Sequence, residues 1–182
     1  SCIPVVGPSI IGAALGQDKV LLKQVLKANN IKTPKYIWLY GNEYDSDMDG
    51  IINKAEKLGY PVIVKPANLG STIGIKAAHN REELVDAIDT ALEYEDKVLI
   101  EEMIPNLLEL NCAVLGNHEY METSLIAAMK MKHELLTFED KYLGSGKKGV
   151  KGSSKTPSMS NSDFRIPAKI SDEMTEEIYK TT

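Results

Sequence analysis

Apolar and polar positions repeat with two different periods along the chain, and these periods predict both helices and strands. Apolar residues three and four apart predict a helix over residues 17–30. Its predicted apolar face consists of Leu21, Leu22, Val25 and Leu26. Capping residues predict three more helices: residues 46–58 with Ser46 and Asp49, residues 80–94 with Asn80 and Glu83, and a last helix after Ser171.

Short apolar runs between these helices predict strands. The runs rich in β-branched and aromatic residues are 2–7, 35–40, 60–66, 75–78 and 97–101. Residues 108–115 alternate between apolar and polar, which predicts one further strand. Gly116-Asn117 predicts a two-residue hairpin turn, and residues 119–126 predict the returning strand. Strands mixed with helices predict an α/β (α+β) fold.

One stretch near the C-terminus has no apolar pattern at all. Residues 143–163 are 21 residues with four Lys, four Gly and six Ser. Such a segment cannot contribute to a core, and loops of this length are typically lids, binding loops or linkers.

Composition and charge exclude two broad classes of function. The chain has 182 residues, with 21 Lys and Arg against 26 Asp and Glu, a net charge of −5. A nucleic-acid binder needs a surplus of basic residues, so that class is excluded. No apolar run approaches the ~18 residues of a membrane span. The two cysteines, Cys2 and Cys112, form no CxxC pair, and such cysteine usage is typical of a reducing compartment. No basic region precedes the mildly apolar residues 2–16, which argues against a signal peptide.

The two ends of the chain predict a fragment of a longer protein. It begins with Ser1 rather than Met, inside a predicted strand, and it stops at Thr182 inside a predicted helix.

A lysine and a glycine-rich loop are the first candidates for chemistry. Lys65 ends an apolar strand and precedes Gly70-Ser-Thr-Ile-Gly74. Small residues let backbone N–H groups approach a phosphate, and the lysine adds a positive charge. The same residues also fit a plain hairpin connection with an edge lysine whose ammonium reaches water. The spacing is neither that of GxxxxGK[ST] nor that of GxGxxG, so the residues alone leave both interpretations open.

Four other residues are weaker candidates. Lys19 lies early in the first predicted helix, where a solvated lysine is common. Glu101 and Glu102 end a strand, and Glu109 lies on the polar side of the next one, where each fits either a ligand contact or solvent. The three histidines have no metal-ligand spacing, and no Ser-His-Asp arrangement is visible.

The order of these motifs resembles the D-alanine–D-alanine ligases of the ATP-grasp superfamily. The resemblance covers nearly the whole chain, and its most specific blocks are KPANLGSTIG at residues 65–74 and EDKY at residues 139–142. The remaining matching blocks are Gly7-Pro-Ser9, Gln17-Asp-Lys19, Val98-Leu-Ile-Glu101 and Glu109 to Asn117.

The resemblance implies a fold, a reaction and a domain organisation. The fold would be a fragment of an ATP-grasp fold, with antiparallel sheets, helices and a nucleotide between two subdomains. ATP would phosphorylate the carboxylate of one D-alanine, and the amine of a second would attack the acyl phosphate. Residues 1–16 would end an N-terminal domain and linker, 17–104 would be the central subdomain, and 105–182 would begin the C-terminal one with an ω-like loop at 139–163.

The resemblance also implies roles for individual residues. The implied ATP-binding set comprises Lys19 and Lys65 on the phosphates, Gly70, Ser71 and Thr72 over the β- and γ-phosphates, Glu101, Glu102 and Ile104 at adenine, Glu109 at ribose, and Lys141 from the mobile loop. Tyr142 with Ser71 would position substrate. Relatives that make an ester carry a His in place of this Tyr, and residues 139–163 contain no His, so the resemblance favours a dipeptide product.

The expected context is cytoplasmic synthesis of peptidoglycan precursors, which supports the cell wall and cell shape. The Mg²⁺ ligands are expected in the C-terminal part of the longer enzyme, for which a homodimer is the expected assembly. The isolated chain is expected to bind ATP weakly and to make no dipeptide. D-serine remains open as the second substrate, as do another ATP-grasp carboxylate–amine ligase and a non-catalytic nucleotide-binding module.

Overall fold

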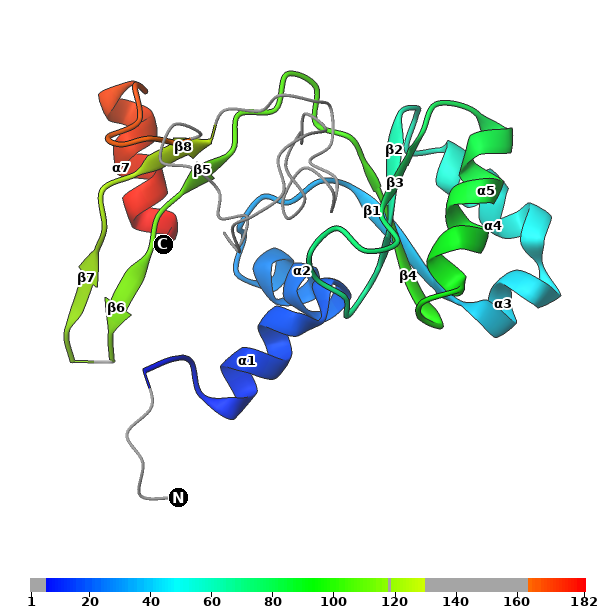
Figure 1. The fold of residues 1–182 in the computed structure, drawn as a ribbon, viewed down its shortest axis with the longest axis horizontal. Helices are drawn as coiled ribbons and strands as arrows, with labels where there is room; N and C mark the ends of the chain where they lie inside the picture. The colour runs from blue at the N-terminus through cyan, green and yellow to red at the C-terminus, as the bar shows by residue number, and fades with distance from the viewer. Residues whose placement is uncertain (1–5, 118, 130–163) are drawn as a thin grey trace, which may run out of the picture. The chain divides into compact units, whose positions relative to one another are not determined.

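The structure is a computed structural model that describes residues 6–117, 119–129 and 164–182. The chain divides into two compact units, Ser1–Ile104 and Pro105–Thr182 (Figure 1). The predicted strand at residues 2–7 and the predicted ω-like loop at 139–163 lie wholly or largely outside the described residues.

The first unit is built on one antiparallel sheet of four strands in the order β1-β4-β2-β3. These strands are β1 (Tyr36–Tyr40), β2 (Val62–Pro66), β3 (Lys76–Ala78) and β4 (Lys97–Glu102). The helices are α1 (Ile10–Gln17), α2 (Lys19–Ala28), α3 (Gly41–Ser46), α4 (Met48–Glu56) and α5 (Arg81–Leu92).

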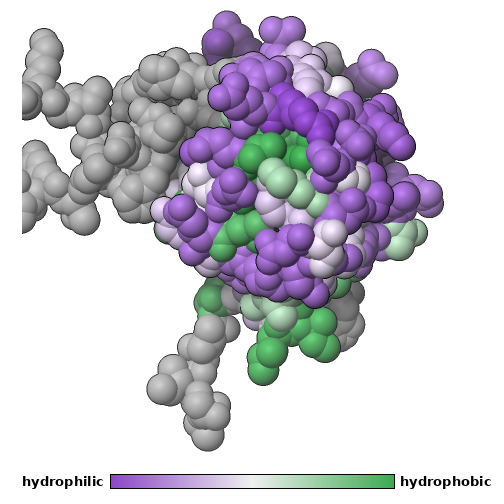
Figure 2. Space-filling model, turned by 90° about the vertical axis from the view of Figure 1, so that its right-hand side faces the viewer, coloured by the Kyte–Doolittle hydropathy of each residue, from purple (hydrophilic) through white to green (hydrophobic). Residues whose placement is uncertain are grey.

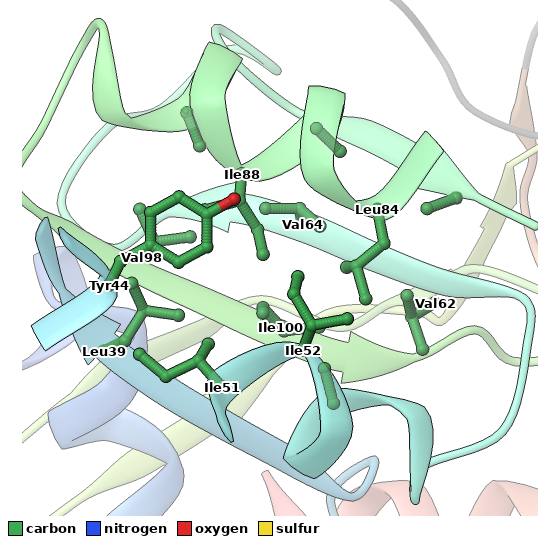
Figure 3. Close-up of a cluster of buried hydrophobic side chains, with 14 residues drawn as sticks. Leu39, Tyr44, Ile51, Ile52, Val62, Val64, Leu84, Ile88, Val98 and Ile100 are labelled. Carbon is green, nitrogen blue, oxygen red and sulfur yellow. The ribbon is translucent and has the colours of Figure 1, made fainter. Parts of the chain in front are cut away.

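One face of this sheet forms the hydrophobic core. Side chains alternate along β2 and β4, and Val62, Val64, Val98 and Ile100 point toward the helices α4 and α5. Leu84 and Ile88 of α5 and Ile52 of α4 meet them in Figure 3. The outward surface of this helical side is largely hydrophilic in Figure 2, as expected for helices with one apolar stripe.

The opposite face of the sheet is covered by α2 and carries charge. A small apolar cluster of Val20, Ala67 and Leu99 joins α2 to the sheet. Lys65 of β2 and Glu101 of β4 lie on this same face, because the alternation that buries Val64 and Ile100 turns their neighbours the other way.

The second unit contains three short pieces of sheet and a helix. Strands β5 (Leu110–Asn111), β8 (Ala127–Met129) and β9 (Phe164–Arg165) form one sheet, and β6 (Val114–Gly116) pairs with β7 (Met121–Thr123). Helix α7 (Asp172–Thr181) is capped by Ser171, whose side chain accepts from Met174 N–H.

Most predicted elements are present, and the mixture of helices and antiparallel sheets is confirmed. Asn80 caps α5 by accepting from Glu83 N–H, as the sequence predicts.

The first predicted helix is wrong in its start and in its buried face. Asp18 interrupts residues 17–30 by capping α2, and α1 precedes it within a segment predicted as linker. Of the predicted face, Leu21 and Val25 are exposed and Leu22 and Leu26 are half-buried. Val20 and Lys23 are buried instead, so the side of α2 that meets the sheet is shifted from the predicted one.

Three other boundaries differ from the prediction. The helix expected from Ser46 is capped by Asp47, and the six-residue α3 precedes it. The predicted strand 108–115 is broken between β5 and β6, where Ala113 N–H donates to Ser124 Oγ. Gly116 pairs with Met121, so four residues rather than two connect the hairpin.

Candidate functional site

Lys65 and Glu101 are diagonal neighbours on the α2-covered face of the sheet. Lys65 pairs in register with Leu99, and Glu101 with Ile63. This places the Lys65 ammonium in an ion pair with Glu101 Oε1. The Lys65 side chain is 22% exposed, so it remains accessible from solvent.

Glu101 is buried between two lysines. Its Oε1 accepts from Lys65, and its Oε2 lies 2.7 Å from Lys23 Nζ. Burial alone would raise the pKa of this carboxyl, but the charges and hydrogen bonds of Lys65 and Lys23 outweigh burial and lower it. Glu101 is therefore held as a carboxylate.

Lys23 is a site residue that the sequence analysis missed. Its side chain is only 10% exposed, and its ammonium also donates to Thr33 Oγ1 at 2.6 Å and Pro34 O at 3.3 Å. The ammonium lies 5.0 Å from the centre of the Tyr36 ring. Its main partner is 78 positions away in the sequence, so no local pattern could have revealed it.

Lys19 faces the start of the glycine-rich loop rather than solvent. Its ammonium donates to the carbonyls of Pro66 at 3.0 Å and Ala67 at 3.2 Å, and to that of Leu69. Burial, together with the nearby positive charge of Lys65, lowers the pKa of Lys19 below that of an ordinary lysine. Two of the predicted phosphate-binding lysines are thus brought together at the end of β2.

Helix α2 is fixed in this position by its first turn. Asp18 accepts from Val20 and Leu21 N–H, and its other oxygen lies 2.7 Å from Lys97 Nζ. The N–H of Lys19 donates to Ala67 O at 3.0 Å. The helix start, strand β4 and the loop root therefore form one hydrogen-bonded unit.

The glycine-rich loop adopts an uncommon backbone conformation. Ser71 and Thr72 have φ of +56° and +65°, a left-handed region that such residues rarely occupy. Thr72 Oγ1 is buried without a hydrogen-bond partner. A side chain at Gly74, at φ +67°, would come within 2.8 Å of Pro66 Cγ. Consecutive strained residues and an orphaned hydroxyl fit a loop built to bind a group that donates to or accepts from it.

The end of β4 has an incomplete hydrogen-bond ladder. Met103 N–H donates to Pro61 O at 3.1 Å, but Pro61 has no N–H to return to the carbonyl of Met103. The side chain of Glu102 accepts from Lys35 N–H at 2.9 Å, so this predicted adenine contact has a structural partner. Ile104 follows and is 42% exposed.

Three predicted site residues fall outside the described residues of the first unit. Glu109 belongs to the second unit, where its carbonyl accepts from Met129 N–H at 3.0 Å. Lys141 and Tyr142 lie outside the described residues. A cavity of about 390 Å³ lies beside β1, α3 and α4 and contains none of the predicted site residues.

The family comparison covers most of the chain. The family described as D-ala D-ala ligase C-terminus matches residues 25–182. The chain belongs to this ligase family.

Curated relatives carry the same name. A D-alanine–D-alanine ligase of Thermoanaerobacter sp. (strain X514) is 39% identical over 178 residues, which are 98% of this chain and 45% of that protein. The chain therefore spans about half the length of the D-alanine–D-alanine ligases that it matches.

Solved structures of these ligases resemble the chain over the same extent. The VanG D-Ala:D-Ser ligase of Enterococcus faecalis matches with a TM-score of 0.73 and 27% identity, over 98% of this chain and 46% of that one. The D-alanine–D-alanine ligase of Helicobacter pylori matches with a TM-score of 0.64 and 26% identity, over 98% and 45%. The expected ATP-grasp fold, seen as a fragment, is confirmed by this likeness.

Proposed function

We propose that this chain forms the ATP-binding part of a D-alanine–D-alanine ligase. The observation that carries the proposal is that Lys19 is bound to the root of a strained loop with an orphaned Thr72 hydroxyl, within the electrostatic reach of Lys65. Two ammonium groups beside a loop of small residues are suited to a polyphosphate. Because the chain belongs to the ligase family, we assign this polyphosphate to the ATP of the ligase reaction.

The proposed reaction has two steps. A carboxylate oxygen of the first D-alanine attacks the γ-phosphorus of ATP, and ADP leaves. The amine of the second D-alanine then attacks the acyl carbon, loses a proton, and expels phosphate to give the dipeptide. Negative charge is spread over phosphoryl oxygens in the first step, so fixed positive charges stabilise its transition state.

The chain's own residues would bind and orient the nucleotide in this proposal. Lys19 and Lys65 would neutralise the phosphates, while Gly70, Ser71 and Thr72 would cover the β- and γ-phosphates. Glu101, Glu102 and Ile104 at the end of β4 would meet adenine through backbone groups, since both carboxylate oxygens of Glu101 are already paired with lysines. Glu109 would accept from the ribose. Lys141 would contact the nucleotide, and Tyr142 with Ser71 would position substrate.

The described residues do not fit a Mg²⁺ site. Among residues 6–117, 119–129 and 164–182, no three His, Cys, Asp or Glu side chains gather where they could hold a metal ion. We therefore assign no step to the metal within this chain.

The second substrate has two candidates. The D-Ala:D-Ser ligase of Enterococcus faecalis matches this chain with the higher of the two TM-scores quoted above. D-alanine–D-serine ligation is therefore the second candidate function, with the same ATP site. Either product would serve peptidoglycan precursor synthesis, for which we propose a cytoplasmic enzyme. Within the described part of the chain, no helix has the length and apolar character of a membrane span.

The proposal is tested first on nucleotide binding. Titration of the 182-residue chain with ATP by calorimetry is expected to show weak binding, which Lys65→Ala abolishes. Lys54→Ala, which removes an exposed lysine of α4, is the matched control and should bind as the wild type does. Equal binding by the Lys65→Ala variant, with an unchanged melting temperature, would contradict the phosphate role of Lys65.

The reaction is tested by comparing this chain with a longer enzyme in which it is joined to the remaining parts of such a ligase. We expect the 182-residue chain alone to release no phosphate with ATP, Mg²⁺ and D-alanine, and the longer enzyme to release it. Offering D-serine together with D-alanine to the longer enzyme separates the two candidate products. Consumption of ATP with other carboxylates but not with D-alanine would point to a different carboxylate–amine ligase.

A further inference from the structure

Lys65 has two competing partners if it binds phosphate. In the structure its ammonium is paired with Glu101, whose side chain is only 9% exposed. A phosphate that draws Lys65 away would leave the buried Glu101 carboxylate without this partner. Removing one partner of a buried ion pair is strongly unfavourable. Phosphate binding by Lys65 therefore requires that Glu101 keep another cation.

Lys23 meets this requirement by its position. Its Nζ lies 2.7 Å from Glu101 Oε2, on the carboxylate oxygen that Lys65 does not use. Thr33 Oγ1 and Pro34 O accept from the same ammonium, so its three N–H groups have three acceptors. With its side chain 10% exposed, Lys23 is fixed and turned away from solvent.

Lys65 is held less completely than Lys23. Within the described residues its Nζ has one hydrogen-bond partner, Glu101 Oε1, and its side chain is 22% exposed. An ammonium has three N–H groups, which leaves Lys65 able to donate to a second acceptor from solvent. The two lysines on Glu101 thus differ in exposure: Lys23 is buried and turned away from solvent, whereas Lys65 is accessible from it.

We propose that Lys23 is a positioning residue, the permanent counter-ion of Glu101 that allows Lys65 to engage phosphate. Lys23 acts through Glu101 and touches no nucleotide. The role rests on the proposed ATP-binding function, which it deepens by explaining how the buried carboxylate is kept neutralised while Lys65 moves to its ligand.

Binding of ATP and of adenosine to the same variants tests the role. In Lys23→Met, Glu101 is left with Lys65 alone and holds it more strongly, so ATP affinity is expected to fall about tenfold. Adenosine has no phosphate, so its affinity should change less than twofold. Lys27→Met removes an exposed lysine one turn further along α2, and this control should leave both affinities unchanged. Equal losses for ATP and adenosine would overturn the proposal.

A double variant separates this role from a merely structural one. Lys23→Met with Glu101→Gln removes the competing charge together with its counter-ion. We expect it to recover most of the ATP affinity lost in Lys23→Met, whereas two independent structural lesions would add. A double variant that binds ATP no better than Lys23→Met, while retaining the wild-type circular dichroism spectrum, would overturn the proposal.

A measurement without nucleotide distinguishes failure of this inference from failure of the proposed function. The acetylation rate of Lys65 by acetic anhydride, followed by mass spectrometry, reports how firmly its amine is held. We expect slower labelling than wild type in Lys23→Met and faster labelling in Glu101→Gln. If wild type binds no ATP, the proposed function fails but these rates still test the linkage among the three residues. Identical rates in all variants would overturn it.

Discussion

The two faces of the four-stranded sheet in the first unit are made from alternate residues of the same strands, yet they differ in almost every physical respect. Toward α4 and α5, Val64 and Ile100 are completely buried among aliphatic side chains. Toward α2, the neighbouring Lys65 and Glu101 form a charge pair in which Glu101 is buried and Lys65 stays partly exposed. Period-two alternation thus separates a face that holds the fold together from a face arranged for charge.

This difference teaches where stability and binding reside. Apolar burial is non-directional and contributes in proportion to area, so the core face stabilises the unit whatever the second face carries. A buried carboxylate with two ammonium partners contributes little net stability compared with apolar packing, but it fixes charges in space. We expect substitutions on the core face to change unfolding, and those on the charged face to change binding and pH dependence.

The largest expected effect is on the core face. Ile100→Ala leaves a cavity among residues with no room to collapse, and it should lower the free energy of unfolding by about 4 kcal/mol. Urea denaturation followed by circular dichroism measures this loss, with Ile100→Val as the conservative control at about 1 kcal/mol. The ATP affinity of the folded molecules should stay unchanged. A large change in that affinity would break the separation of the two faces.

A smaller but pH-dependent effect is expected on the charged face. Glu101→Gln should cost about 3 kcal/mol near neutral pH, because it leaves Lys23 and Lys65 without their shared anion. Lys65 and Lys23 lower the folded pKa of Glu101 below its unfolded value, so the unfolded state binds the proton first as pH falls. The carboxylate's contribution is complete above the unfolded pKa and disappears as pH falls through the folded one.

Denaturation across acidic pH measures this contribution. The stability difference between wild type and Glu101→Gln should be full at about pH 7 and should shrink below about pH 4. A difference that is constant over this range would mean that Glu101 is not held as a carboxylate by the two lysines.

The smallest expected effect concerns the junction of α2 with the sheet. Asp18→Ala removes both the helix cap and the ion pair with Lys97, and it should cost about 1–2 kcal/mol. Asp18→Asn keeps an oxygen for the cap and loses only the charge, so it should cost less. Thermal unfolding ranks the two variants. An equally large loss in both would mean that the Lys97 ion pair, not the cap, anchors the helix start.

Local signals were sufficient for the elements whose patterns are regular. Strands β1, β2 and β4 were predicted from β-branched and aromatic runs, and α5 from Asn80 and Glu83, because the physical cause lies within a few residues. Helix α1 was missed because its apolar residues show no polar face, and none of them is buried in the structure. Helix α3 has only six residues and follows Tyr40, which is not a usual capping residue, although Glu43 accepts from Tyr40 N–H.

The charges of the candidate site were only partly predictable. Lys65 could be identified because a lysine that ends an apolar strand before a glycine-rich loop is locally unusual. Lys19 and Glu101 gained weight only from the family resemblance, and their assigned roles remain proposals. Lys23 could not be found, because its importance depends on the register of β4 against β2 and on how α2 is turned over them. Contacts between residues far apart in the sequence form only in the folded chain and produce no periodic pattern in the sequence.

Pro61 has no backbone N–H, and this gives the end of β4 a preference for ligands that donate a hydrogen bond. The carbonyl of Met103 lies opposite a residue that cannot donate to it, so it keeps a lone pair for another donor. The exocyclic amino group on the six-membered ring of adenine can donate to this carbonyl. Guanine and hypoxanthine have an oxo group at the same position, which is an acceptor and would be repelled by the carbonyl oxygen. We expect a nucleotide bound at this strand end to be selected by base, with ATP preferred over GTP and ITP.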